Sequence, residues 1–152
     1  MRISAKADYA VRAAAELAAT DSDVPVKGEQ IAQAQSIPIK FLENILVDLR
    51  QAGIVNSRRG PEGGYWLARP AEEVTVADVM RAAEGPLASV RGEKPEDLDY
   101  AGAAEPLRDV WVALRSGLRD VLEHVTLADI AGGNLPKPVT ERTREPGAWQ
   151  RR

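Results

Sequence analysis

The sequence predicts a mainly α-helical protein with one small β-hairpin. Apolar residues recur at helical spacing through most of residues 4–52 and again through 107–125. Two short strand-like runs, 54–59 and 65–69, flank a glycine-rich loop. Ala, Val, Leu and Ile supply most of the apolar 44 % of the 152 residues, beside one Phe and three Trp. Such a composition favours close packing of helices over a large β-sandwich.

The chain begins with a predicted amphipathic helix from Ser4 to about Ala19. Its apolar residues lie three or four positions apart, and Ser4 is a suitable N-cap. The run TDSDVP, residues 20–25, is expected to end this helix.

Two short helices joined by a tight turn are predicted next. The first covers residues 28–35, and the second covers about 38–52. Pro38 suits the first turn of the second helix, and Gly53 suits a left-handed cap at its end. This pattern is typical of a helix-turn-helix, whose second helix lies in the major groove of DNA, although most pairs of short helices are only packing units.

A hairpin is predicted directly after the helix pair, with the loop GPEGG between its strands. Pro61 sets the start of the loop, and Gly63 and Gly64 are expected to supply positive φ angles. A phosphate-binding loop of an enzyme is excluded, because no Gly-Lys-Ser/Thr follows and no helix opens after the glycines. An ordinary surface hairpin remains an alternative. Arg58 and Arg59 before the loop favour a wing whose guanidinium groups enter the minor groove of DNA.

Two nearly identical stretches predict two similarly capped helices. VTVADV at 74–79 places Thr75 as an N-cap with Asp78 three residues later, and VTLADI at 125–130 repeats the pattern. We interpret this as one capping solution used twice. Residues 88–104 show no period and carry charge, Gly and Pro, which indicates a long loop.

The most regular apolar pattern belongs to a helix that begins near Pro106. Its apolar residues fall four and three positions apart, as in the seam of a coiled coil. Packing against its own domain is one interpretation of this stripe, and a dimerisation helix about 20 residues long is the other. The proposed dimerisation residues are Leu107, Trp111, Leu114, Leu118, Val121 and Val125.

The charge and composition exclude several functions. The chain has no cysteine, which excludes disulfides and thiol catalysis. It has one histidine and no set of acid and base residues that would form a catalytic site, so nothing indicates an enzyme. The net charge is −3, but residues 1–69 hold nine Lys and Arg against eight Asp and Glu. Charged residues interrupt the first apolar segment, so it is no signal peptide, and nothing predicts a membrane span. The expected location is the cytoplasm.

The segments MRISAKADYAVRA, SIPIKFLENILVDLRQAGIVNSRRGPEGGYWLARP and VTLADI carry a resemblance to a known family. Through them the chain resembles the Rrf-two (Rrf2) family of bacterial winged-helix transcription regulators, over about 130 of its 152 residues. The resemblance implies a homodimer with crossed long helices that inserts each wing into a minor groove. The DNA-binding residues it implies, together with the wing arginines, are Lys40, Phe41, Glu43, Arg50, Ser57, Arg58, Arg59 and Gly60.

The sequence also departs from this family. Cluster-binding members carry three cysteines in the loop before the dimerisation helix, and here that loop, residues 88–104, has none. Asp8 matches an acidic ligand position of one branch, but without cysteines its expected role is solvation or charge near the start of a helix. His124 is interpreted as a residue on a helix face. We therefore expect no metal, no cofactor and no cluster, and an effector that is a small molecule or a partner protein.

These observations predict a cluster-free dimeric transcriptional regulator, a repressor or an activator, that binds double-stranded DNA at a pseudo-palindromic operator. The alternative is a winged-helix protein-interaction module regulated through a partner enzyme. The expected organisation is a winged helix-turn-helix domain over 1–87, a sensor-type loop over 88–104, a dimerisation helix and return element over 105–131, and a disordered tail over 132–152.

Overall fold

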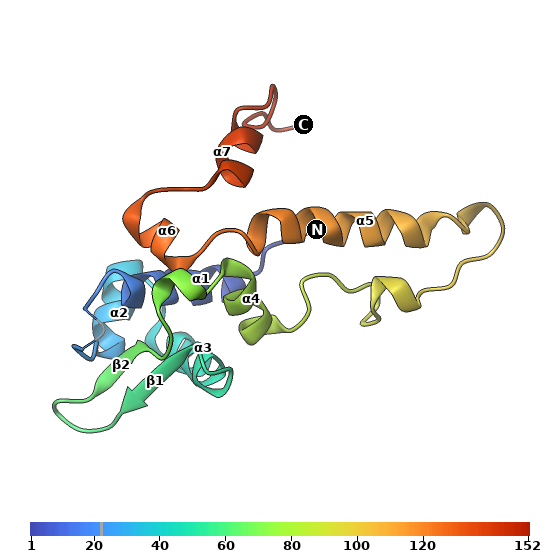
Figure 1. The fold of residues 1–152 in the computed structure, drawn as a ribbon. Helices are drawn as coiled ribbons and strands as arrows, with labels where there is room; N and C mark the ends of the chain where they lie inside the picture. The colour runs from blue at the N-terminus through green and yellow to red at the C-terminus, as the bar shows by residue number, and fades with distance from the viewer. Residues whose placement is uncertain (22) are drawn as a thin grey trace.

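The computed structural model describes residues 1–21 and 23–152, so one residue of the predicted break at 20–25 lies outside the described part. The described residues form seven α-helices and a two-stranded antiparallel sheet, which confirms the mainly α class with a small wing (Figure 1). The elements are α1 (Ala5–Ala18), α2 (Gly28–Gln35), α3 (Ile39–Gln51), β1 (Val55–Arg58), β2 (Gly64–Leu67), η1 (Ala71–Glu73), α4 (Val76–Glu84), η2 (Pro95–Asp97), η3 (Gly102–Ala104), α5 (Leu107–Leu122), α6 (Leu127–Gly132) and α7 (Lys137–Thr143).

Helix α1 lies at the centre of the domain and contacts α2, α3, α4, α6 and β2. Its inward positions include Ala10, Ala13 and Ala14, all fully buried, and their small side chains let the surrounding helices approach closely. Ser4 caps the helix as predicted, because its hydroxyl accepts a hydrogen bond from the Ala7 amide at 3.0 Å. The alanine-rich sequence of the first helix therefore builds the core.

The turn between α2 and α3 fixes the helix-turn-helix. Ser36 takes a left-handed conformation, with φ of 52°, and the Ile37 amide donates to the Ala32 carbonyl at 2.9 Å. Helix α3 then begins after Pro38 and ends before Gly53, whose φ is 75°. The apolar stripe of α3 is buried, and its members are Leu42, Ile45, Leu46 and Leu49.

Both predicted capping motifs form. The Thr75 hydroxyl accepts from the Asp78 amide at 3.1 Å, and the Asp78 carboxylate accepts from the Thr75 amide at 3.0 Å. Thr126 and Asp129 make the same two bonds at 3.0 and 2.9 Å. Each pair supplies partners for amides that the helix start leaves free, so α4 and α6 begin at these threonines.

The two capping motifs also lie against each other. The Val76 amide donates to the Val125 carbonyl at 2.9 Å, and the Leu127 amide donates to the Val74 carbonyl at 2.9 Å. This antiparallel bridge corrects the predicted extent of the dimerisation helix. Helix α5 has 16 residues, and Val125 lies beyond its end with only 5 % of its surface exposed. Val125 belongs to the interior of its own chain and is not part of an exposed seam.

Helix α5 projects beyond the compact helical domain, with residues 88–104 running beside it (Figure 1). The expected disordered tail over 132–152 contains a helix, because residues 137–143 form α7. Arg142 of α7 forms an ion pair with Asp120 of α5, with 3.8 Å between Nη2 and Oδ2. Helix α7 and the C-terminus lie at the opposite end of the molecule from β1, β2 and α3 (Figure 1). None of the helices formed by the described residues has the length and apolar character needed to cross a membrane.

Candidate nucleic-acid interface

Helix α3 presents a polar face opposite its buried stripe. Lys40 and Glu43 are exposed on this face, as a helix that reads base edges requires. Phe41 is 42 % exposed, and its ring meets the ring of Tyr9 edge to face, with 5.5 Å between centroids. The aromatic contact joins α3 to α1, so one side of Phe41 is held by the protein and the other remains open.

The two side chains predicted to contact phosphates lie together where α3 meets the wing. Arg50, in the last turn of α3, donates from Nη1 to the Ser57 hydroxyl on β1 at 3.3 Å. The structure thus brings together residues seven positions apart in the sequence. A guanidinium and a hydroxyl on one edge offer hydrogen-bond donors to a single phosphate group.

The wing is the hairpin β1–β2 with the tip formed by residues 59–63. Its register pairs Val55 with Leu67 and Arg58 with Gly64. Arg58 donates from Nη2 to the Glu62 carbonyl at 3.2 Å, so its side chain folds back on the loop. Arg59 is exposed and forms no hydrogen bond or ion pair with the part of the chain that the structure describes. The two arginines therefore differ: Arg58 is bonded within the loop, whereas the guanidinium of Arg59 is exposed and has no partner among the described residues.

The glycines of the wing act differently from the prediction. Positive φ angles occur at Gly60, with 100°, and Gly64, with 145°, but not at Gly63. Gly63 is required for space instead, because a Cβ atom there would lie 2.0 Å from the Arg58 carbonyl oxygen. The sequence pattern identified positions that need glycine, whereas the path of the loop decides whether each glycine supplies a positive φ angle or space for a close backbone contact.

Arg12 is a functional candidate that the sequence analysis missed. From α1 it donates Nη1 to the Gln35 carbonyl at 2.7 Å, at the end of α2, and its guanidinium lies 4.6 Å from the Tyr9 ring centroid. Its Nε lies 3.0 Å from the carboxylate of Asp8, one helical turn away. Arg12 therefore holds the turn of the helix-turn-helix beside the aromatic pair. The spacing of Asp8 and Arg12 was the available signal in the sequence.

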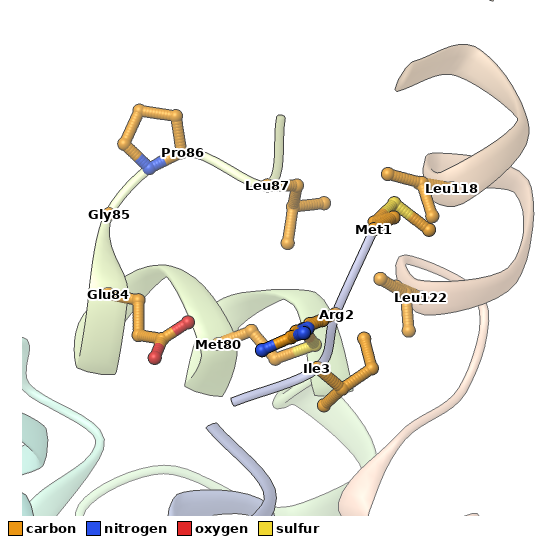
Figure 2. A pocket seen from close by; sticks show the side chains of 10 residues that line it. All are labelled: Met1, Arg2, Ile3, Met80, Glu84, Gly85, Pro86, Leu87, Leu118 and Leu122. Atoms are coloured by element: carbon orange, nitrogen blue, oxygen red, sulfur yellow. The ribbon is translucent and has the colours of Figure 1, made fainter. Parts of the chain in front are cut away.

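Helix α5 carries an apolar stripe that its own chain covers only in part. No residue of α5 is fully buried, Leu114 is 40 % exposed and Val110 is 54 % exposed. The predicted seam residues Leu107, Trp111, Leu118 and Val121 are half-buried. Figure 2 shows Leu118 and Leu122 of α5 beside Met1, in a pocket that Met80 of α4 also lines. The apolar stripe of α5 is therefore left partly accessible to solvent.

The loop at 88–104 is held to α5 by its own side chains. Glu96 forms an ion pair with Arg115, and Trp111 donates from its indole nitrogen to the Tyr100 hydroxyl at 3.1 Å. The backbone and the Arg115 guanidinium lower the pKa of Glu96 below its ordinary value. Leu98, between these two contacts, is 2 % exposed. The loop is thus an ordered segment with a small apolar anchor.

A paired helix unit with a polar outer face, followed by a hairpin with an exposed arginine, defines a winged helix-turn-helix DNA-binding protein. A sequence model of the Rrf2 family, described as an iron-dependent transcriptional regulator, matches residues 3–133. The chain belongs to this family, whose members are transcriptional regulators and not enzymes.

Individual relatives agree with the family assignment. The chain is 54 % identical over 141 residues to Rv1287 of Mycobacterium tuberculosis, named as a candidate HTH-type transcriptional regulator, covering 93 % of this chain and 88 % of the relative. It is 35 % identical over 131 residues to the HTH-type transcriptional regulator CymR of Bacillus subtilis, covering 86 % and 90 %.

Solved structures show the same fold. The structure of CymR, the global cysteine regulator of B. subtilis, superposes with a TM-score of 0.73 at 32 % identity, over 88 % of this chain and 98 % of that one. The structure of IscR from T. potens gives a TM-score of 0.71 at 32 % identity, over 88 % of both chains.

The family description names iron, and the residues of this chain do not fit an iron–sulfur cluster. There is no cysteine in the sequence, and the described residues bring together no group of three or more His, Asp or Glu side chains. Asp8 is engaged with Arg12. His124 lies just after α5, not within it as predicted, and its Nδ1 is 2.9 Å from the Asp120 carbonyl oxygen. These donors do not replace the thiolates that such clusters need.

Proposed function

We propose that this protein is a homodimeric, cluster-free repressor that binds a pseudo-palindromic DNA operator. The observation that carries the proposal is the pairing of an open α3 face with a wing whose Arg59 has no intramolecular bond among the described residues. In the proposed complex Lys40 and Glu43 contact base edges in the major groove, Glu43 by accepting from a cytosine amino group. Arg50 and Ser57 contact phosphates.

The wing arginine supplies the second contact region. A narrow minor groove has a strongly negative potential that attracts a guanidinium, so Arg59 inserts there while Gly60 lets the backbone approach. The part of the sequence that carries these elements, residues 1–69, has nearly balanced charge, which permits approach to phosphate despite the net charge of −3.

The dimer is supported by α5. A stripe that includes Leu114 and Leu118 remains accessible along a helix that projects from the domain. In the proposed dimer two copies of this stripe cover each other. They place the two winged helix-turn-helix domains, here called the reading heads, at two half-sites. A repressor acts by occupying such a site ahead of the transcription machinery.

The test is genome-wide mapping of the occupied DNA sites, followed by titration of a recovered site with purified protein. We expect a two-fold-related motif, binding by a dimer, and increased transcription of neighbouring genes when the protein is absent. Decreased transcription would exclude the repressor, and failure to recover any motif would exclude sequence-specific binding.

The acidic net charge favours one alternative function, a winged helix that binds a protein and is regulated through a partner enzyme. Salt separates the two functions. DNA binding through phosphates weakens steeply as salt rises, in proportion to the number of phosphate contacts. Retention on operator DNA that does not depend on salt, or no retention at all, would favour the alternative.

A further inference from the structure

Lys27 makes an unexpected contact between the helix-turn-helix and the wing. It is the residue before α2, and its ammonium donates a hydrogen bond to the Gly60 carbonyl at the wing tip, with 2.7 Å between Nζ and the oxygen. The same carbonyl accepts from the Gly63 amide at 3.0 Å. Two donors therefore fix one carbonyl group in the middle of the tip.

The backbone beside Lys27 also joins the wing. Val26 and Tyr65 exchange two hydrogen bonds, each 2.8 Å long, so residue 26 forms an isolated antiparallel bridge with β2. The approach is so close at Gly64 that a Cβ atom would lie 2.6 Å from the Val26 carbonyl oxygen. The segment before α2 thus holds the base of the wing through Val26 and its tip through Lys27.

The other side chains that the structure describes do not hold the tip in this way. Arg58 bonds to Glu62 within the same loop. Arg50 bonds to Ser57, which lies on β1 below the tip. Among the described residues, Lys27 is the one side chain that bonds residues 59–63 to the helix-turn-helix.

Local rules of helix formation do not explain a lysine at this position. Ser, Thr, Asp and Asn are preferred before the first turn, and a positive charge there opposes the helix dipole. The Lys27 side chain makes no capping bond, while the Gln30 side chain accepts from the Lys27 amide at 3.1 Å. At this position the Lys27 side chain makes its hydrogen bond with the Gly60 carbonyl instead of a capping bond.

We propose that Lys27 is a positioning residue for DNA binding, which fixes the wing tip relative to α3 and so sets where Arg59 meets the minor groove. The inference rests on the proposed function, because it assigns a role within DNA binding. It differs from a phosphate contact, in which the ammonium would act on DNA directly and independently of the wing. In a positioning role the effect of Lys27 passes through Arg59.

The first experiment measures the tip in the free protein. Lys27→Met keeps the aliphatic chain and removes the donor. Lys94→Met removes an equal charge from the exposed loop at 88–104 and serves as the matched control. We expect amide hydrogen exchange at Gly63 to become faster in Lys27→Met and to stay unchanged in Lys94→Met. Unchanged exchange at Gly63 in Lys27→Met would overturn the proposal that the Lys27–Gly60 hydrogen bond, the tether, holds the wing tip.

The second experiment is a double-mutant cycle on operator affinity at fixed salt. We expect Lys27→Met to weaken binding about tenfold, the loss typical of one charge-assisted hydrogen bond, and to have less than about a twofold effect in an Arg59→Ala background. Equal effects in both backgrounds would show an independent phosphate contact and overturn the positioning role, as would wild-type affinity in Lys27→Met. If the wild-type protein binds no operator, the proposed function fails, whereas the exchange measurement still decides whether the tether exists.

Discussion

Replacement of Leu114 by aspartate should separate the proposed dimer without unfolding the reading head. Leu114 lies in the middle of the apolar stripe of α5 and is 40 % exposed in the single chain. The buried core of the domain comes from other helices, above all α1 and α3. The substitution therefore acts on the surface that a second copy would cover.

The structure gives the size of the effect. Full burial of a leucine contributes about 1.5–3 kcal/mol, so covering the remaining two fifths contributes about 1 kcal/mol per protomer. A symmetric dimer contains the substitution twice, and about 2 kcal/mol corresponds to roughly a 30-fold change in the dimer dissociation constant. The aspartate adds the cost of removing a charge from water without a partner, so the dissociation constant should rise by more than this.

The assay is size-exclusion chromatography with light scattering across a dilution series, together with circular dichroism. Ser116→Asp is the matched control, because Ser116 is an exposed residue of α5 outside the seam positions. We expect the control to remain dimeric and to bind operator, and Leu114→Asp to be a folded monomer with lost operator affinity. A dimer of unchanged affinity in Leu114→Asp would show that α5 is not the interface.

Four further results are expected. Arg59→Ala should weaken operator binding by about 1–3 kcal/mol, measured by gel-shift titration at moderate salt, as for other lost groove contacts. Glu43→Ala should relax base preference, so a selection from random DNA that returns an unchanged motif would contradict its role. Because the pKa of Glu96 is lowered in the folded protein, its ion pair with Arg115 stabilises the fold above the unfolded-state pKa of about 4.5. This stabilisation is lost as pH falls through the lower folded-state pKa. In an acid unfolding titration, Glu96→Gln should therefore lack this loss of stability. Protein prepared without oxygen should be colourless, and visible charge-transfer bands with matching iron and acid-labile sulfide would refute the cluster-free assignment.

The local parts of the fold were predictable because short-range rules govern them. Ser4, Thr75 and Thr126 cap helices as their side chains suggest, and Gly53 ends α3 in a left-handed conformation. The exposure of Lys40 and the other polar positions of α3 follows directly from its 3.6-residue period.

The errors arise where distant segments meet. The seven-residue pattern continues to Val125, but the helix stops earlier because that residue pairs with Val76 in another capping motif. The contacts of Arg12 and Lys27 with backbone carbonyls likewise depend on chain segments far away in the sequence. A lysine or arginine gives no sequence signal that distinguishes such a tether from a solvated surface charge. For this reason the open side chains of the candidate site were predictable, whereas the residues that hold it in place were not.

In the proposed dimer, the bridge between the two capping motifs bears on the spacing of the two DNA half-sites. Because residues 125–127 hydrogen-bond to residues 74–76, the segment that follows α5 is joined to the start of α4. In the proposed dimer we expect this joint to restrict the angle between the two DNA-binding domains. One base pair inserted between the half-sites turns the far one by about 35° and shifts it by about 3.4 Å. We therefore expect the second wing or the second recognition helix of the proposed dimer to miss its groove, so that the helical phase of the two half-sites becomes part of the recognised sequence.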